Sequence, residues 1–545
     1  MKKPTLKTPS LKAPSLKAPD LKALGGSRTG TSLLAGAVVL GAVFGIAELR
    51  PPVGAADAVN GQATSAQVER TAKVCPQPLQ GIVGATTLSL FTPAGGTATG
   101  GYGALMNVVP HAPATAAPSA APSAPAAPSA PAASPAADPA NTAPLDAQVA
   151  LAKVGVPVQG PALNNDSAPG TFAVGTGAFA PGFSVGQTTV VPDQQGLGLS
   201  GIDCTASGTS FWFAGASTAG DRVDYVSLVN SDSIAAVVDL KLYGDKGPIT
   251  VDGADGFTVA PGTSQAIRLP ILVKDQKDLA IHVVARSGRI GAALHAADGN
   301  KGSDWIPASA DPAPTQVVPG LAADAGTAHL VVAAPGDDDA DLKVQVSGKN
   351  GWFTPAGFET VHVKAGMVTA VDLGQITRSE PGAIRLSPSD PAHPTPVVAT
   401  IRIDRGGNGK SDAAWLSGAV PVGLRASLAD NRGGGVTTLY LTSTGEAAAK
   451  VRVTASAGSG GGTPTTKEID LPAGATVSLP APEPADLKGS FGLTVETVSG
   501  GPVMAARMLA IPLKDVPMFT VQSFRDDRST VSVPHADQDP AVLLR

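Results

Sequence analysis

The sequence predicts a mainly β protein: tandem antiparallel β-sandwich modules, immunoglobulin-like in architecture, that follow one N-terminal transmembrane helix. Three observations predict it. A 19-residue stretch near the N-terminus carries no charge, a repeat of about 105 residues contains strands of alternating polarity, and the chain is poor in charged and aromatic residues.

Composition and length limit the class of protein. The 545 residues are 43% hydrophobic and only 15% charged, against about 25% charged in typical soluble domains. Aromatic residues make up 4%, so the cores must be built from Val, Leu, Ile and Ala. The 64 glycines and 49 prolines indicate many turns. This length suggests about three or four domains, and thin aliphatic cores favour small sandwiches over a large enzyme domain.

The basic tail at residues 1–28 contains seven basic residues and one acidic residue, a local charge of +6. The whole chain has a net charge of −5, so the residues after the tail carry −11. This acidic remainder argues against a nucleic-acid partner, because a protein binds nucleic acid through a concentrated basic face. The tail repeats the pattern LKxPS from Leu6, and a proline at every fifth residue forbids a continuous helix. Its lysines either hold the tail on anionic lipid or act only as a solvated topology signal.

Residues 29–49 are predicted to form a transmembrane helix. The uncharged run 29–47 spans about 28 Å as a helix, close to the hydrocarbon thickness of a bilayer. The positive-inside rule places residues 1–28 in the cytoplasm and the C-terminal bulk outside the cell. The alternative is a cleaved signal peptide, with small-residue sites at 53–55 and 56–58. An uncleaved anchor is favoured because the apolar run exceeds the usual 7–15 residues and both sites lie beyond Pro51 and Pro52.

The only two cysteines are Cys75 and Cys204, with no CxxC pair and no zinc spacing. In an exported region a Cys75–Cys204 disulfide is the natural interpretation, worth about 4–5 kcal/mol in the chain-entropy model. Two unpaired buried thiols are the alternative. The disulfide would fold the short β segment 66–110 onto the first module, which makes the Ala/Pro/Ser spacer at 111–147 an excursion instead of a domain boundary. That composition predicts a disordered, semi-rigid spacer.

The internal repeat defines the modules. A half-buried strand recurs at 238–242, 342–346 and 451–455, and a turn with glycine recurs at 259–262, 363–366 and 471–474. Each unit opens with a tryptophan, Trp212, Trp305 or Trp415, expected as a core plug, with a carbohydrate platform as the alternative. The predicted division is a β-rich connection at 148–211, modules at 212–304, 305–412 and 413–522, and a polar C-terminal tail at 523–545.

No catalytic, cofactor-binding or metal-binding residue set is predicted. The sequence lacks HExxH, GxSxG and the phosphate-loop pattern. Four acidic residues gather in the segment GDDDAD at 336–341, and a solvated turn is favoured there over a Ca²⁺ site. Asp221, Asp224 and Asp232 are interpreted with the same caution. The glycine-rich segment 405–410 is expected to connect two modules.

Three short motifs resemble a family of actinobacterial envelope proteins that carry a domain of unknown function. They are CPQP at Cys75–Pro78, GIDC followed by FWFAG within Gly201–Gly215, and YVSLVN at Tyr225–Asn230. The resemblance covers about residues 70–520. It implies membrane attachment or secretion, association with envelope polysaccharide machinery, and no known activity.

We therefore expect a non-enzymatic, single-pass membrane protein whose extracellular part presents a scaffold or binding surface at the cell envelope, to a protein or a glycan. Tandem sandwiches are expected to form a rod, and the spacer to add reach. One alternative is an accessory subunit of an envelope glycosyltransferase or polysaccharide exporter, contacting its partner through Gly41 and Gly45. The other is a hydrolase with an unrecognised site.

Overall fold

The computed structural model describes residues 64–78, 84–110, 147–164, 168–192, 197–299 and 301–533. Over these residues the protein is almost entirely β, with antiparallel sheets, which confirms the predicted class. The two short helical turns are η1 (Gly177–Phe179) and α2 (Leu269–Leu272). No helix among the described residues is long and apolar enough to cross a bilayer, and the predicted span 29–49 lies outside them.

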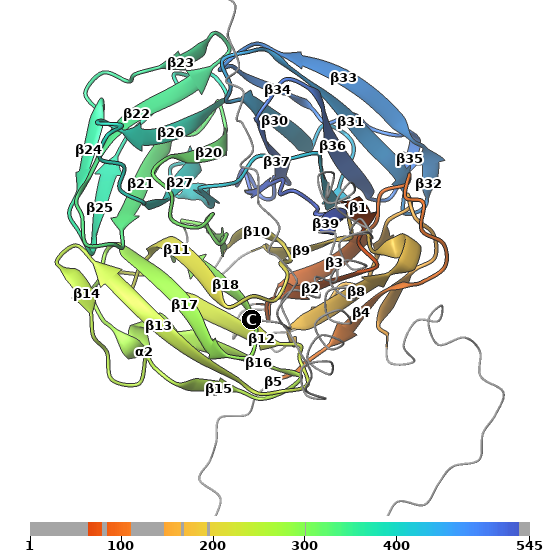
Figure 1. The fold of residues 1–545 in the computed structure, drawn as a ribbon, viewed down its shortest axis with the longest axis horizontal. Coiled ribbons are helices and arrows are strands. Elements are labelled where there is room, and N and C mark those ends of the chain that lie inside the picture. Colours follow the sequence, from red (N-terminus) through yellow and green to blue (C-terminus); the bar gives the residue numbers. More distant parts are fainter. Residues whose placement is uncertain are drawn as a thin grey trace, which may run out of the picture. The chain divides into compact units, whose positions relative to one another are not determined.

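The chain divides into two compact units, Met1–Thr64 with Ser532–Arg545, and Ser65–Val531. The second unit, hereafter the folded body, contains eight principal sheets that pack face to face in pairs. We call each pair a sandwich and number them along the chain; Figure 1 shows their strands in sequence colours. A short two-stranded sheet joins β1 (Thr64–Gln67) to β39 (Thr530–Val533).

The first two sandwiches have the same order of strands in their two sheets. The first sandwich consists of β2 (Arg70–Cys75), β8 (Thr171–Thr176), β4 (Gly103–Asn107) and β6 (Val149–Leu151), facing β10 (Gly198–Asp203), β9 (Ser184–Val191), β3 (Ala85–Phe91) and β7 (Val158–Gln159). The second consists of β11 (Ser210–Ala216), β17 (Leu279–Ser287), β13 (Ala236–Gly244), β14 (Gly247–Ile249) and β15 (Phe257–Val259), facing β19 (Ser303–Ile306), β18 (Gly291–Ala297), β12 (Tyr225–Asn230), β16 (Thr263–Arg268) and the parallel β5 (Val109–Pro110).

The third and fourth sandwiches repeat the same order. The third consists of β20 (Gln316–Leu321), β26 (Gly382–Pro388), β22 (Ala340–Gly348), β23 (Gly351–Phe353) and β24 (Thr360–Val363), facing β28 (Lys410–Ser417), β27 (Val398–Gly407), β21 (Thr327–Ala334) and β25 (Met367–Asp372). The fourth consists of β29 (Arg425–Asn431), β36 (Phe491–Ser499), β31 (Ala449–Gly458) and β33 (Thr465–Leu471), facing β38 (Phe519–Ser523), β37 (Val503–Ala510), β30 (Thr437–Ser443) and β34 (Thr476–Pro480), with β32 (Gly461–Thr463) and β35 (Ala485–Lys488) forming an added ribbon.

The predicted alternation determines which face of each repeat strand is buried. In β22, Leu342, Val344 and Val346 are buried, whereas Lys343 is exposed. The same pattern holds in β31, where Val451 and Val453 are fully buried. A period of two places alternate side chains on one face, so each strand buries its aliphatic face against the opposite sheet.

The first sandwich differs from the predicted division of the chain. Sequence reasoning separates residues 66–110 and 148–211, but the structure joins them into one sandwich with the strand order of the other three. The Ala/Pro/Ser segment 111–147 falls between β5 and β6, and both of these strands belong to the folded body. The segment is therefore an insertion within the body and does not separate two domains.

The tryptophans also lie differently from the expectation. Trp212 lies in β11, the first strand of its sandwich, but Trp305 and Trp415 lie in β19 and β28, the last strands of theirs. The third and fourth sandwiches begin instead at Gln316 and Arg425. All three residues are buried, at 7%, 3% and 1% exposure, which leaves no exposed carbohydrate platform at these positions. They do not plug the cores of their own modules: Trp212 packs on the third sandwich, Trp305 on Ile202 of the first, and Trp415 in the core of the second.

Neighbouring sandwiches share interfaces that return to the first one. The first strand of each packs on the next sandwich: β11 contacts β21 and β27, β20 contacts β30 and β37, and β29 contacts β3 and β9. Val74 of β2 packs with Val229 of β12. Because the fourth sandwich contacts the first, the contacts close in a cycle. The expected linear rod is therefore wrong.

The recurring glycine turn has a structural cause. Gly366 and Gly474 both adopt positive φ, 68° and 69°, where a side chain is strained. A Cβ atom at Gly366 would lie 3.4 Å from Pro248 Cδ, and one at Gly474 would lie 2.7 Å from Trp352 Cδ1. Pro248 and Trp352 belong to β14 and β23 of the preceding sandwiches. At these two turns the glycine lies against the preceding sandwich, whereas a Cβ atom at Gly262 would meet nothing within 4 Å.

Candidate functional site: a buried carboxylate pair

The last strands of all four sandwiches, β10, β19, β28 and β38, lie against one another. Two aspartates occupy this junction: Asp304 in β19 is 1% exposed and Asp412 in β28 is 0% exposed. Charged groups are rarely buried so completely unless partners satisfy them. Their hydrogen bonds show what they hold together.

Asp412 binds all three other last strands. Its Oδ2 accepts hydrogen bonds from the backbone N–H groups of Leu199 (3.1 Å) and Phe519 (2.9 Å). Its Oδ1 accepts from Ala413 N–H at 2.9 Å, and Ser303 N–H is a fourth donor to the carboxyl group. One side chain from the third sandwich thus satisfies backbone donors of the first, second and fourth.

Asp304 makes a similar junction from the second sandwich. Its Oδ1 accepts from the N–H groups of Gly201 and Trp305, both at 2.8 Å. Its Oδ2 lies 2.8 Å from Thr520 Oγ1 in the fourth sandwich. Thr520 Oγ1 also accepts from Gln522 Nε2, at 2.6 Å. Unlike Asp412 Oδ2, which faces two obligatory donors, Asp304 Oδ2 faces a hydroxyl group that can either donate or accept.

Burial raises the pKa of both carboxyl groups. The pKa of Asp412 rises to about 7, although four backbone N–H groups oppose the rise by stabilising the anion. Burial raises the pKa of Asp304 well above its ordinary value, and the nearby Asp412 carboxylate raises it further. Hydrogen bonds from Gly201, Thr520 and Trp305 oppose this rise in the pKa of Asp304 by stabilising its anion.

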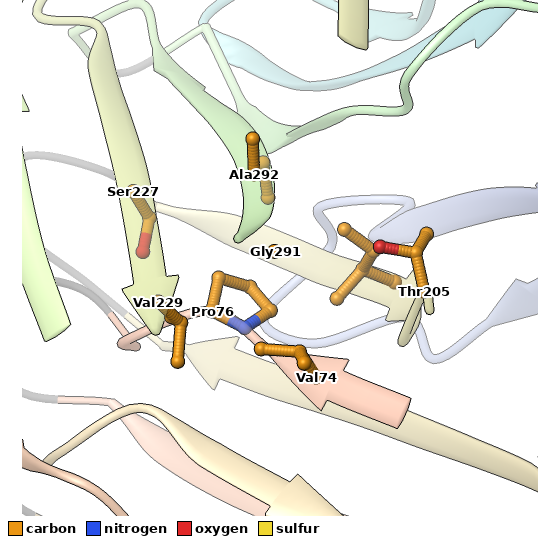
Figure 2. A pocket seen from close by; sticks show the side chains of 9 residues that line it. Val74, Pro76, Thr205, Ser227, Val229, Gly291 and Ala292 are labelled. Carbon is orange, nitrogen blue, oxygen red and sulfur yellow. The ribbon is translucent and has the colours of Figure 1, made fainter. Parts of the chain in front are cut away.

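Two small cavities lie beside this junction. The larger has about 30 Å³ of free space and is lined in part by Asp203, Gln522 and Arg525, from the ends of β10 and β38. Figure 2 shows the smaller one, of about 10 Å³, between Val74, Pro76 and Gly291. Ile202, Thr205 and Ala292 line both. Such volumes match one or two water molecules, whereas small-molecule pockets measure about 300–1,000 Å³.

The seam between the first and fourth sandwiches is a second buried polar cluster. Asp430, which is 0% exposed, accepts a 2.7 Å hydrogen bond from Thr188 Oγ1 of the first sandwich and pairs with Arg432 at 3.1 Å. Arg507 donates to the Asp430 carbonyl and to Gln522 Oε1. Burial alone would raise the pKa of Asp430, but Arg432, Arg507 and Thr188 outweigh it and lower the pKa. Burial lowers the pKa of Arg507 to about 10.

Charged contacts also join the second and third sandwiches. His329 Nε2 lies 2.8 Å from Asp278 Oδ1 of the second sandwich and its Nδ1 lies 2.5 Å from Asp372 Oδ1. The hydrogen bond to Asp278 is the main reason that the pKa of His329 is raised. Nearby, the guanidinium carbons of Arg222 and Arg402 lie 5.1 and 5.2 Å from the Trp415 ring centroid.

The predicted Cys75–Cys204 disulfide is present in the structure. It lies in the core of the first sandwich, and both cysteines are 0% exposed. It links β2 to the residue after β10, so it joins the two sheets of a sandwich whose chain is interrupted by the insertion.

The structure brings none of the other sequence candidates together into a site. Asp339 and Asp341 of the acidic segment face His362, whose Nδ1 lies 2.8 Å from Asp341 Oδ1. Asp224 pairs with Arg222, and Asp232 with Arg289. Over the described residues, no group of three or more His, Cys, Asp or Glu side chains could hold a metal ion. Residues 405–410 form the hairpin between β27 and β28 and do not connect two sandwiches.

Sequence reasoning missed Asp304 and Asp412, and a local signal was present. Both follow a serine, as Ser303-Asp304 and Ser411-Asp412, and both precede a tryptophan in the last strand of a sandwich. The pairing of Asp304 with Thr520 spans 216 residues of sequence, so it could not be read from local pattern.

The fold and this junction define a class of multi-sandwich β protein whose repeats meet on buried aspartates. The chain belongs to the DUF5719 family, a family of unknown function, whose model matches residues 162–482. The match begins within the first sandwich and ends within the fourth. Comparison with curated proteins and with solved structures finds no match.

Proposed function

We propose that the protein is a membrane-anchored, extracytoplasmic protein whose immunoglobulin-like sandwiches present a binding or scaffolding surface at the cell envelope, without catalysis. One observation carries the proposal: buried side chains are shared among all four sandwiches, with Asp412 alone binding backbone donors of the other three. Such sharing fixes the sandwiches relative to one another. A body of this kind holds its surface loops in constant positions, which is what a scaffold requires.

The disulfide supports placement outside the cytoplasm. Disulfides persist in oxidising compartments and are rare in the cytosol. Both cysteines of the Cys75–Cys204 bond lie on the C-terminal side of the predicted membrane helix at 29–49. The disulfide and the predicted topology therefore agree on the side of the membrane.

The insertion at 111–147 does not provide the reach that the sequence suggested. Its two flanks, β5 and β6, both belong to the folded body. The path from the predicted helix to the body consists instead of residues 50–63, whose 14 residues span at most about 50 Å when fully extended. We infer that the body stays close to the membrane.

The carboxylate pair does not resemble a hydrolytic site. Retaining and inverting glycosidases hold two carboxyl groups about 5–10 Å apart around an open space for the sugar. Here Asp304 and Asp412 are 1% and 0% exposed, and backbone or hydroxyl groups occupy their oxygens. We interpret the pair as structural, which supports scaffolding over the hydrolase alternative.

Location and oxidation state test this proposal together. In cells that express the full chain, thiols are trapped by alkylation, membranes are extracted with alkaline carbonate, and intact cells are treated with external protease. We expect an oxidised Cys75–Cys204 pair, retention in the membrane pellet, and cleavage of the body from outside. A reduced pair in a carbonate-soluble protein that external protease does not reach would contradict the proposal.

A further inference from the structure

The point where the chain enters the folded body is fixed by the first sandwich. β2 runs antiparallel to β8, with Arg70 opposite Thr176. Gly177 N–H donates to the Glu69 carbonyl at 3.0 Å. Residues 65–70 therefore lie beside the loop at 177–183 that follows β8. Fourteen residues, 50–63, separate the predicted membrane helix from the first described residue.

An exposed apolar patch lies at the corresponding end of the fourth sandwich. Thr497 N–H donates to the Leu424 carbonyl at 3.2 Å, and Val422 N–H donates to the Val503 carbonyl at 2.9 Å. These bonds hold residues 420–424 beside the loop at 500–502 that connects β36 in one sheet to β37 in the opposite sheet. The patch consists of Val420 (45% exposed), Leu424 (74%) and Val498 (41%), with the exposed prolines Pro421 and Pro502 beside them.

Contacts along the seam connect this patch to the start of the body. Arg425, next to Leu424, pairs with Asp527 at 2.7 Å. A Cβ atom at Gly182, in the loop after β8, would lie 2.7 Å from Asp527 Oδ2 and 2.9 Å from Arg425 Nη2. Val68 N–H donates to the Ser529 carbonyl at 3.0 Å, two residues further along. The apolar patch and residues 65–70 therefore lie on one side of the seam between the first and fourth sandwiches.

We propose that the apolar patch of Val420, Pro421, Leu424, Val498 and Pro502 rests in the interfacial region of the bilayer that residues 29–49 span. This inference rests on the proposed membrane anchoring. Residues 50–63, which reach at most about 50 Å, join the body on the side of the seam where the patch lies, so the patch is on the side to which the tether is attached. Exposed aliphatic side chains such as Leu424 are stabilised when they enter the headgroup–acyl boundary, because their apolar surface is removed from water.

Spin labelling of the full chain in vesicles tests whether the apolar patch lies in the interfacial region of the bilayer. Both native cysteines are in the buried disulfide, so a Leu424→Cys substitution supplies one free thiol for a nitroxide. Ile271→Cys is the matched control, because Ile271 is also a large, exposed aliphatic residue (77% exposed). It lies in α2, before the start of β17 in the second sandwich. Leu424 instead lies beside the end of β36, which is the equivalent strand of the fourth sandwich. Vesicles contain phosphatidylcholine and phosphatidylglycerol, and relaxation is measured with oxygen and with a water-soluble nickel chelate.

The proposal expects oxygen to relax the Leu424 label several-fold more than the nickel chelate does, with the reverse order for Ile271. A label at Val498→Cys should also be relaxed more by oxygen than by the nickel chelate. Agreement between the two positions would show that the whole patch contacts lipid and not only the nitroxide attached at position 424. If carbonate shows an integral protein but both labels prefer the nickel chelate, the patch faces water and the docking inference is overturned while the anchor stands. Protection of Leu424 from both reagents would indicate a protein partner and also overturn it. Release by carbonate would remove the anchor itself, and the docking inference with it.

Discussion

Asp430 and Thr188 join the two ends of the cycle of sandwiches, so their coupling is a direct energetic measure of its closure. We consider Asp430→Asn, Thr188→Val and the double variant. Asp430 is fully buried, accepts a 2.7 Å hydrogen bond from Thr188 and compensates Arg432 and Arg507. Because its pKa is lowered in the folded state, its contribution to stability is present above pH 3.8 and disappears as the pH falls below that value.

The magnitudes follow from burial. Removing one partner of a buried charge pair typically costs about 3–5 kcal/mol, since Arg507 is left with less compensation. Replacing Thr188 by the isosteric Val removes one hydrogen bond to a buried charged group, worth about 1.5–3 kcal/mol. Asp430→Asn weakens the hydrogen bond from Thr188, so Thr188→Val costs less in the Asp430→Asn background than in the wild type. We therefore expect a coupling energy of about 1–2 kcal/mol between the two substitutions.

Equilibrium urea unfolding at pH 7, followed by tryptophan fluorescence, supplies the four free energies of unfolding. A matched control cycle pairs Thr188→Val with Glu468→Gln, a half-exposed carboxylate in the outer strand β33 with side-chain exposure of 47%. That cycle should give coupling within about 0.5 kcal/mol of zero. Zero coupling between Thr188 and Asp430 would mean that the first and fourth sandwiches do not touch, and would refute the closed cycle.

Three further predictions concern the disulfide, the carboxylate pair and the insertion. Replacing Cys75 and Cys204 together by Ala should lower the free energy of unfolding by about 2–5 kcal/mol, measured by urea unfolding, and reductant should then have no further effect; an unchanged midpoint would contradict a role in the first sandwich. Asp304→Asn should change the unfolding free energy by less than about 1 kcal/mol at pH 5, because an amide mimics the neutral acid. Since the raised pKa of Asp304 makes the wild type lose stability as the pH rises above 3.8, the variant should gain on the wild type between pH 5 and pH 8, and a constant difference across this range would contradict the assignment. A protease site can be placed within residues 111–147 and cut. The two fragments should migrate together without reductant, because the disulfide links them, and the melting temperature should stay within a few degrees of that of the uncut chain, because strands from both sides of the cut pair within the first sandwich. Unfolding on cleavage would show that the insertion holds that sandwich together.

The parts of the fold that could be predicted are those that local pattern encodes. Leu342, Val344 and Val346 alternate with polar residues, and the glycine turns at Gly366 and Gly474 recur at a fixed spacing, so the strands and turns of the later sandwiches were readable. The disulfide followed from there being only two cysteines in a region expected to be exported.

The first sandwich was missed for a physical reason. Its strands β6 and β7 contain only three and two residues, too short to show a period. The insertion at 111–147 also separates β4 from β6, which pair as neighbours in the sheet. With the repeat hidden there, sequence reasoning counted three modules and expected them in a row.

The carboxylate junction could not be predicted because its partners are distant in sequence. Asp412 meets Leu199 and Phe519, which are 213 and 107 residues away. Locally, Asp304 and Asp412 share only a preceding serine and a following tryptophan, which do not show that the two aspartates meet. Only the cyclic contact of the four last strands encloses them, and that contact depends on how whole sandwiches pack.

A cross-link between the first and fourth sandwiches tests the closed arrangement most directly. A Cβ atom at Gly186 would lie 3.7 Å from Asp430 Cβ, within the range that a disulfide requires. We expect the full chain carrying Gly186→Cys and Asp430→Cys to form this second disulfide nearly completely, detected as the linked peptide by mass spectrometry. Free thiols at both positions, in protein whose Cys75–Cys204 bond has formed, would contradict the arrangement.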